Sequence, residues 1–120
     1  MACGTTYDCG LSAALAVVGG KWKPLVLWNL LGGPRRFGEL RRSIAGISEK
    51  MLIQQLRELE ADGVVSRHDF GEVPPRVEYA MTDFGTTLIE ALKPLCGWGA
   101  THMERIVATK AARAEVEANA

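Results

Sequence analysis

Basic side chains gather in one short stretch of the chain, where they could bind the phosphates of a nucleic acid. Residues 21–42 contain six Lys or Arg and a single acidic residue, Glu39. The formal net charge of the whole chain is zero, but counterion release depends on the charges at the contact surface rather than on their sum. A charged face that only contacts water explains the composition equally well, so the pattern depends on the fold that presents it.

A second group of polar residues has the spacing of one face of a helix. We expect a helix from about Glu49 to Ala61, in which Leu52, Leu56 and Leu59 form the buried side. Its other side carries side chains that can read base edges in a major groove, which are Ser48, Glu49, Lys50, Gln54 and Gln55. Lysine reaches guanine acceptors or phosphate, and glutamine offers the paired donor and acceptor that read adenine. A solvated helix face is the competing interpretation, because every amphipathic helix has one.

The elements around this helix predict how it is positioned. In chain order we expect helices over about 9–18, 22–31 and 37–42, a glycine turn at 45–47 and then the helix described above. Two strands follow over 64–70 and 77–81, and after them come a long helix from about 83 and a last amphipathic helix around 103–107. The expected caps are Asp8, Ser48 and Gly63, and Pro94 should kink the long helix.

A short helix, a turn, a longer helix and a hairpin, in that order, are typical of a winged helix-turn-helix. The predicted fold class is mainly α with a small β-hairpin (α+β), with added helices at the N- and C-terminal ends. The domain boundaries we expect are a flexible arm over residues 1–7, the winged domain over 8–108 and a helical tail over 109–120.

Basic residues at the edges of these elements can hold the sugar–phosphate backbone without reading sequence. Those ahead of the glycine turn are Lys23, Arg36, Arg41 and Arg42. Arg76 follows two prolines at the expected wing tip, where it can probe the minor groove or its phosphates. A salt bridge from Arg76 to Glu72 or Glu78 is the equally weighted alternative.

Long runs of the sequence carry a specific resemblance. They are GGKWKPLVLWNLLGGPRRFGELRRSIAGISEKMLIQQLRELEADGVVSR, EVPPRVEYAMTDFG and LCGWG, within roughly Cys9 to Gly99. The chain resembles the HxlR-type family of MarR-related winged-helix regulators. The resemblance implies a bacterial transcription regulator, more often a repressor, that binds inverted-repeat operators in double-stranded DNA as a homodimer. It also implies a dimer built by the first and terminal helices, with Ser48–Asp62 in the major groove.

The three cysteines do not have the spacing of a secreted disulfide scaffold, and one is left unpaired within a monomer. Cys9 lies in the first turn of a predicted helix, a setting that activates thiols, although Asp8 opposes this. The resemblance implies a sensor here, since some members respond to oxidants or electrophiles through a cysteine ahead of the first helix. Gly10 follows Cys9 where the family often has proline. Cys3 is a candidate resolving thiol or incidental, and Cys96 is expected in the core.

Other function classes lack a matching pattern. We find no nucleophile with a base, no paired carboxylates and no phosphate-binding loop, so we expect neither an enzyme nor a cofactor. His68 and His102 are not spaced with the cysteines as in a zinc site. The absence of a signal peptide and of a membrane span, together with the cysteines, favours the cytoplasm. Two alternatives stay open: a protein-interaction module, and a small-molecule effector at the dimer interface near Trp22, Trp28 and Trp98.

Overall fold

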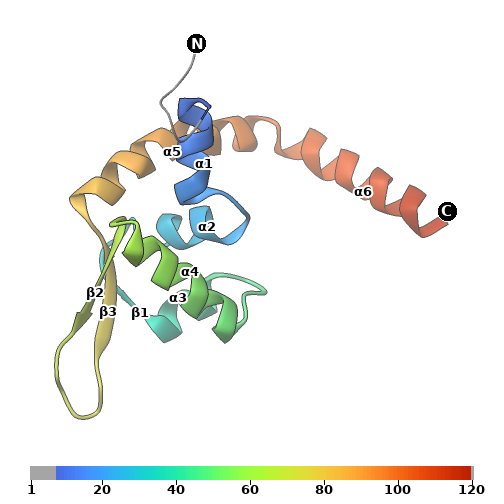
Figure 1. Ribbon diagram of the computed structural model, residues 1–120. Helices are drawn as coiled ribbons and strands as arrows, with labels where there is room; N and C mark the ends of the chain where they lie inside the picture. Colours follow the sequence, from blue (N-terminus) through green and yellow to red (C-terminus); the bar gives the residue numbers. More distant parts are fainter. Residues whose placement is uncertain (1–7, 120) are drawn as a thin grey trace. The chain divides into compact units, whose positions relative to one another are not determined.

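The computed structural model describes residues 8–119, and the predicted arm over residues 1–7, with Cys3, lies outside them. Close contacts divide the chain into two units, Met1–Ile89 and Glu90–Ala120, and each is described by itself. The elements follow one another (Figure 1) as α1 (Gly10–Val18), α2 (Trp22–Trp28), β1 (Arg35–Arg36), α3 (Phe37–Ser43), α4 (Glu49–Ala61), β2 (Val65–Asp69), β3 (Val77–Met81), α5 (Asp83–Thr101) and α6 (Met103–Asn119). Helix α5 begins in the first unit and ends in the second.

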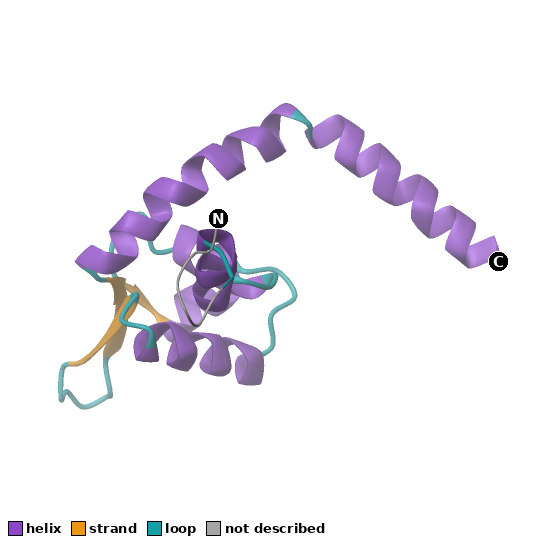
Figure 2. Ribbon diagram, turned by 45° about the horizontal axis from the view of Figure 1, so that its top comes forward, coloured by secondary structure: helices purple, strands orange, loops and turns teal. Residues whose placement is uncertain are grey.

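The core of the first unit is aliphatic and surrounds one side of α4. Leu52, Leu56 and Leu59 are at most 1% exposed, which confirms the predicted buried side of this helix. Helices α1 to α4 lie to one side of the β2–β3 hairpin, and the loop of the hairpin projects beyond them (Figure 2). The other buried aliphatic side chains are Val18, Val26, Leu27, Leu30, Leu40, Ile44, Ile47, Val64, Val65 and Ile89. Removing this apolar surface from water is the main force that holds α4 in place.

Three antiparallel strands form the sheet, in the order β1–β3–β2. The β2–β3 hairpin confirms the predicted wing. Strand β1 is an addition to the prediction, because a strand of two residues is too short to show an alternating pattern. Arg35 of β1 and Arg67 of β2 both pair with Tyr79 of β3, so these three side chains lie on the same face of the sheet.

Local signals fix where α4 begins and ends. Ser48 has an extended backbone, and its Oγ accepts a hydrogen bond from the amide of Met51 at 3.1 Å. Ser48 is therefore the N-cap that the sequence predicts. After α4 the chain turns at Gly63 with a φ of 77°, a left-handed conformation that favours glycine.

One helix departs from its predicted bounds, and the long helix keeps Pro94 in its interior. Helix α2 ends at Trp28 rather than near Leu31, because the amide of Leu30 bonds to the carbonyl of Leu27, three residues back. Helix α5 agrees with the predicted long helix and contains Pro94 within it, since the missing N–H removes one hydrogen bond of a helix that the other bonds maintain.

A close packing point joins the start of α5 to the turn after α4. Thr82 Oγ1 donates to the carbonyl of Gly63 at 2.6 Å and accepts from the amide of Gly85 at 3.0 Å. The amide of Thr82 donates to the carbonyl of Val64 at 3.1 Å. Gly85 is buried, and a Cβ atom at this position would lie against the carbonyl oxygen of Val64. The absence of a side chain at Gly85 therefore lets α5 approach the hairpin closely.

Candidate nucleic-acid interface

The side of α4 opposite its leucines is exposed and polar. A helix turns by about 100° per residue, so Lys50, Gln54 and Arg57 project together on this outer face. All three are exposed, and within residues 8–119 neither Lys50 nor Arg57 forms an ion pair. Arg57 is not among the residues predicted from the sequence. Its place three residues after Gln54 and seven after Lys50 is the signal that identifies it.

Two hollows run along this outer face. The first has a volume of about 600 Å³ and is lined by Glu49, Lys50, Ile53, Gln54, Arg57 and Glu58. Ile53 is half-buried and is the only apolar residue of that lining. The second hollow, of about 390 Å³, shares Ile53 and Arg57 and adds Glu60, Arg67 and Tyr79. The outer face of α4 is therefore continuous with the face of the sheet that carries Tyr79.

The beginning of α4 carries two further predicted residues, both exposed. The oxygen of Ser48 caps the helix as an acceptor, which leaves the hydroxyl hydrogen as a possible donor to a ligand. Glu49 Oε2 lies 3.5 Å from Nη1 of Arg41 on α3. This ion pair offsets the charge of Arg41 and places a carboxylate where phosphates would approach.

Gln55 lies beside the outer face rather than on it, and its contact with DNA stays a prediction. It lies about 100° around the helix from Gln54 and is half-buried. Its Nε2 donates to Sδ of Met51, one turn earlier, at 3.1 Å. Gln55 is therefore directed along the flank of α4 rather than toward a groove.

Lys23 is also placed differently from the prediction of a phosphate contact. Its Nζ lies 2.8 Å from Oε1 of Glu58 on α4, and its side chain is only 12% exposed. The hydrogen bond from Lys23 is the main cause that lowers the pKa of Glu58 below its ordinary value, with further lowering by a hydrogen bond from Gln54. Lys23 thus joins α2 to α4, and its ammonium is already engaged.

Arg36, just before α3, and Arg42 on α3 are more open than Lys23. Arg36 and Arg42 are exposed and have no acidic partner in the described part of the chain. Arg42 lines a hollow of about 460 Å³ whose other members are Phe37, Gly38, Arg41 and Glu49. Both side chains remain candidates for contacts with phosphates.

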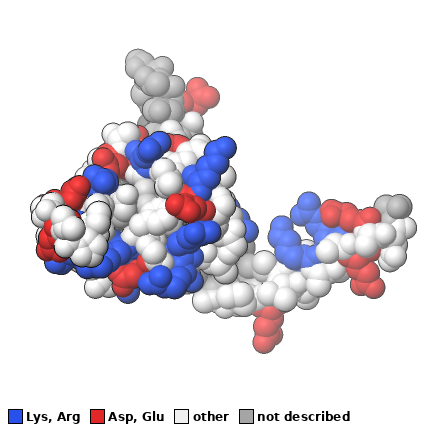
Figure 3. Space-filling view, turned by 90° about the horizontal axis from the view of Figure 1, so that it is seen from below, with Lys and Arg blue, Asp and Glu red and all other residues white. Residues whose placement is uncertain are grey.

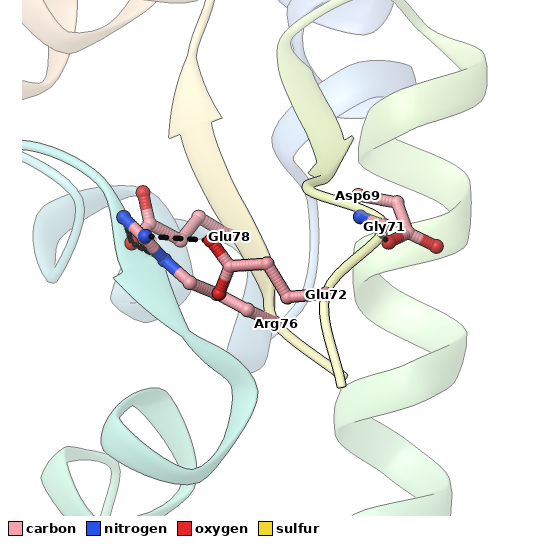
Figure 4. Close-up of polar contacts among 5 residues, drawn as sticks. All are labelled: Asp69, Gly71, Glu72, Arg76 and Glu78. Atoms are coloured by element: carbon pink, nitrogen blue, oxygen red, sulfur yellow. Dashed lines mark hydrogen bonds and ion pairs between the residues drawn. The ribbon is translucent and has the colours of Figure 1, made fainter. Parts of the chain in front are cut away.

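Arg76, in the loop of the hairpin, forms ion pairs with two neighbouring carboxylates. Nη1 of Arg76 lies 3.4 Å from Oε1 of Glu72, and Nη2 lies 3.2 Å from Oε2 of Glu78 (Figure 4). The guanidinium also stacks over the ring of Phe70, 3.9 Å from its centroid. Arg76 is predicted either to contact DNA or to form a salt bridge with Glu72 or Glu78. The salt bridges are present in the structure. The loop is further held by a hydrogen bond from the amide of Gly71 to Asp69.

The charges of the first unit do not form a uniformly positive surface. Figure 3 shows the lower face of Figure 1, on which α3 and the loop of the hairpin lie. Lys and Arg side chains are spread over this face, and Asp and Glu side chains lie between them. Pairs such as Arg35–Glu39 and Arg41–Glu49 account for part of this mixture. The cations that have no acidic partner within residues 8–119 are therefore the candidates for contacts with phosphates.

Residues 17–107 match the HxlR-like helix-turn-helix family. The chain belongs to this family. The hairpin beside the helix-turn-helix makes it a winged helix-turn-helix protein, and the proteins it matches are HTH-type transcriptional regulators.

Individual relatives support this assignment. The uncharacterized HTH-type transcriptional regulator YkvN of Bacillus subtilis is 50% identical over 99 residues, which cover 82% of this chain and 84% of YkvN. YtcD, another uncharacterized HTH-type regulator of Bacillus subtilis, is 48% identical over 100 residues, covering 83% of this chain and 79% of YtcD. The solved structure of the redox regulator HypR in its reduced form has a TM-score of 0.77 and 41% identity, covering 82% of this chain and 97% of HypR.

Apolar side chains of this HxlR-like chain remain exposed in both units. On α1, Leu11 is 69% and Leu15 is 54% exposed. In the second unit, none of the described residues, 90–119, is buried. Its exposed apolar side chains are Leu95, Trp98, Met103, Val107 and Val116.

The two described cysteines differ from their predicted settings. Cys9 itself, rather than Asp8, is the N-cap of α1, and its Sγ accepts a hydrogen bond from the amide of Ser12 at 3.4 Å. Cys9 is half-buried. Cys96 is exposed and does not lie in a core, because no described residue of the second unit is buried.

The structure also bears on the remaining alternatives. Trp22 and Trp28 are half-buried in the first unit. Trp98 lines a hollow of about 300 Å³ in the second unit, with His102, Arg105, Ile106, Thr109 and Lys110. Among residues 8–119, no group of three or more His, Cys, Asp or Glu is placed to hold a metal ion. No helix of the described chain is long and apolar enough to span a bilayer.

Proposed function

We propose that this chain regulates transcription, most simply as a repressor, by binding double-stranded DNA as a homodimer. Helix α4 enters the major groove, and α3 and the wing contact the flanking backbone. The observation that supports this is the outer face of α4, where Lys50, Gln54 and Arg57 are exposed together. Two cations that have no acidic partner among residues 8–119, together with one amide, provide both phosphate attraction and base readout on a stiff helix.

The exposed apolar surfaces support the homodimer. A second copy that packs against α1 and against the helices of the second unit would bury Leu11, Leu15 and the apolar side chains of residues 90–119. A two-fold symmetric dimer presents two copies of α4, which fit two half-sites of an inverted repeat. A dimer would thus bury the exposed apolar side chains and match the two-fold symmetry of an inverted-repeat operator.

Binding to duplexes at several salt concentrations tests the proposal. Fluorescence anisotropy should show a preference for promoter fragments over random duplexes, with affinity that falls steeply as salt rises. Lys50→Ala and Arg57→Ala should each weaken binding, and a residue that contacts a phosphate lowers the salt slope by about 0.9. Arg113→Ala removes one positive charge from α6, where Glu117 is its ion-pair partner. It is the control for the change in net charge and should weaken binding less than either variant of α4.

Other outcomes would contradict the proposal. If the protein binds every duplex equally, or binds none at low salt, a protein-interaction module becomes the better explanation of the fold. A stable monomer in analytical ultracentrifugation at micromolar concentration would contradict the homodimer. Because dimerisation and DNA binding are measured separately, each part of the proposal can fail alone.

We further propose that Cys9 controls this binding in response to oxidants or electrophiles. An electrophile with an activated C=C bond would add the Cys9 sulfur to one carbon as the π bond breaks, and the other carbon would take up a proton. An oxidant such as diamide would take two electrons and two protons, which reduces its N=N bond to HN–NH, as Cys9 and a second thiol form a disulfide. Either product changes the sulfur that accepts the hydrogen bond from the amide of Ser12. The beginning of α1, which carries Leu11 and Leu15, would therefore change its conformation. Similarity to the redox regulator HypR adds support.

A comparison of treated and untreated protein tests this control. Diamide should weaken operator binding by the wild-type chain and leave Cys9→Ser unaffected, whereas Cys96→Ser should respond as the wild type does. Equal operator affinity of the wild type before and after diamide would remove the idea. If diamide also weakens operator binding by Cys9→Ser, the effect belongs to another residue.

A further inference from the structure

Ile53 is the one apolar side chain in the hollow along the outer face of α4. The other five lining residues are polar or charged, namely Glu49, Lys50, Gln54, Arg57 and Glu58. Ile53 is half-buried, whereas the core side of the helix is occupied by the leucines at 52, 56 and 59. Its side chain therefore presents apolar surface to a face that otherwise offers charges and amides.

The position of Ile53 between two free cations restricts what could cover it. Lys50 precedes it and Arg57 follows it, each about one turn away along the helix. Both cations are exposed and lack an acidic partner among the described residues. An occupant of this hollow thus has to offer anionic or acceptor groups on both sides of a small apolar group.

The edge of a base pair in the major groove has this composition. Guanine and phosphate oxygens accept from Lys and Arg, and the C5-methyl group of thymine is the apolar group that major-groove edges display. One turn of helix spans about 5 Å and a base step about 3.4 Å, so the three side chains can reach successive base pairs. A thymine methyl between two such contacts would fill the hollow.

We propose that Ile53 is a specificity-determining residue that contacts the C5-methyl group of a thymine in each half-site. This inference rests on the proposed binding of α4 in the major groove. It adds a contact that discriminates thymine from cytosine without a hydrogen bond. The neighbouring Lys50 and Arg57 hold the helix in the register in which Ile53 meets that methyl group.

Replacement of thymine by deoxyuridine tests the contact, because it removes only the methyl group. Duplexes are first selected with the wild-type chain from a random-sequence library, and each thymine of an enriched duplex is then replaced in turn. At one thymine per half-site, we expect deoxyuridine to weaken wild-type binding about fourfold, the effect of one buried methyl group. In Ile53→Ala this ratio should fall to about one, while Ile53→Val should keep most of it.

Controls separate this contact from a general loss of binding. Arg42→Ala on α3 removes an exposed candidate phosphate contact that does not line the hollow with Ile53. It should weaken the thymine and deoxyuridine duplexes equally and so keep the wild-type ratio. Thermal unfolding shows whether Ile53→Ala is folded. If this variant does not fold, the ratio of the affinities of the wild-type chain for the thymine and deoxyuridine duplexes still tests the contact. If no thymine of the enriched duplexes is sensitive to its methyl group, or if Ile53→Ala keeps the wild-type ratio, the inference is overturned while DNA binding stands. If no sequence is enriched, the inference and the proposed operator binding are overturned together.

Discussion

The ammonium of Lys23 lies 2.8 Å from a carboxylate oxygen of Glu58 and joins α2 to α4. The side chain of Lys23 is 12% exposed and that of Glu58 is 43% exposed, so the pair lies at the edge of the core rather than in it. Glu58 lies beside the outer face of α4 and lines the first hollow. This contact therefore fixes the helix that is proposed to read DNA.

The first prediction concerns the stability that this contact provides. Lys23→Ala removes the ion pair and the burial of the lysine stem, and we expect the free energy of unfolding to fall by about 1 kcal/mol. Urea denaturation measures this, and Lys21→Ala at the exposed neighbour should change stability by less than about 0.5 kcal/mol. Because Lys23 is engaged with Glu58, the variant should keep the wild-type salt slope of DNA binding. A lower slope would restore Lys23 as a phosphate contact.

The second prediction follows from the titration of Glu58. Its pKa is lowered in the folded chain, chiefly by the hydrogen bond from Lys23, so the unfolded chain binds more protons there at acidic pH. The stabilisation is present above the ordinary pKa of glutamate and is lost as the pH falls through the lowered folded value. Urea unfolding between neutral and acidic pH should thus show a smaller loss of stability in Glu58→Gln than in the wild type. Glu60→Gln on the same helix should retain the wild-type dependence.

The third prediction concerns the carboxylate of Glu49 beside Arg41. Glu49→Gln removes a negative charge from the proposed interface and releases Arg41, so it should tighten binding to random-sequence duplexes at low salt by roughly three- to tenfold. The salt slope should steepen at the same time. Glu117→Gln on α6 is the control for the change in net charge. Unchanged or weaker binding by Glu49→Gln would show that this end of α4 does not face phosphates.

Much of the fold follows from local patterns in the sequence. The repeat of Leu52, Leu56 and Leu59 predicts the buried side of α4, and Ser48 and Gly63 predict its ends. These signals act within a few residues, so no knowledge of the tertiary structure is needed to interpret them. The order of the elements then predicts the wing.

The features that the sequence does not predict are contacts between segments distant in sequence and the directions of individual side chains. Glu58 lies far along the chain from Lys23, so no local pattern links them and Lys23 is predicted to be free. Strand β1 likewise depends on pairing with β3. In contrast, the direction of Gln55 was within reach of the sequence, because helical spacing already separates it from Gln54 and favours Arg57.

The fourth prediction compares Arg76 in the wing with Arg57 on α4. Arg76 is paired with Glu72 and Glu78, so its charge is already offset and contributes little to phosphate attraction. Arg76→Ala should weaken duplex binding by less than about threefold, whereas Arg57→Ala should weaken it by roughly tenfold or more. Parallel anisotropy titrations at one salt concentration measure both. Equal losses would mean that Arg76 exchanges its carboxylates for phosphates when DNA binds.

The fifth prediction concerns the junction between the hairpin and α5. Gly85 is buried, and a Cβ atom there would press against the backbone carbonyl of Val64, which cannot move aside as a flexible side chain would. Gly85→Ala should therefore lower the free energy of unfolding by roughly 1–3 kcal/mol, although alanine is the better helix former. Gly97→Ala is the matched control in the same helix, because a Cβ there meets no atom within 4 Å. It should leave stability unchanged or raise it by up to about 1 kcal/mol. Urea denaturation of both variants separates the two effects, and equal stability of the two would show that α5 can shift away from Val64 without cost.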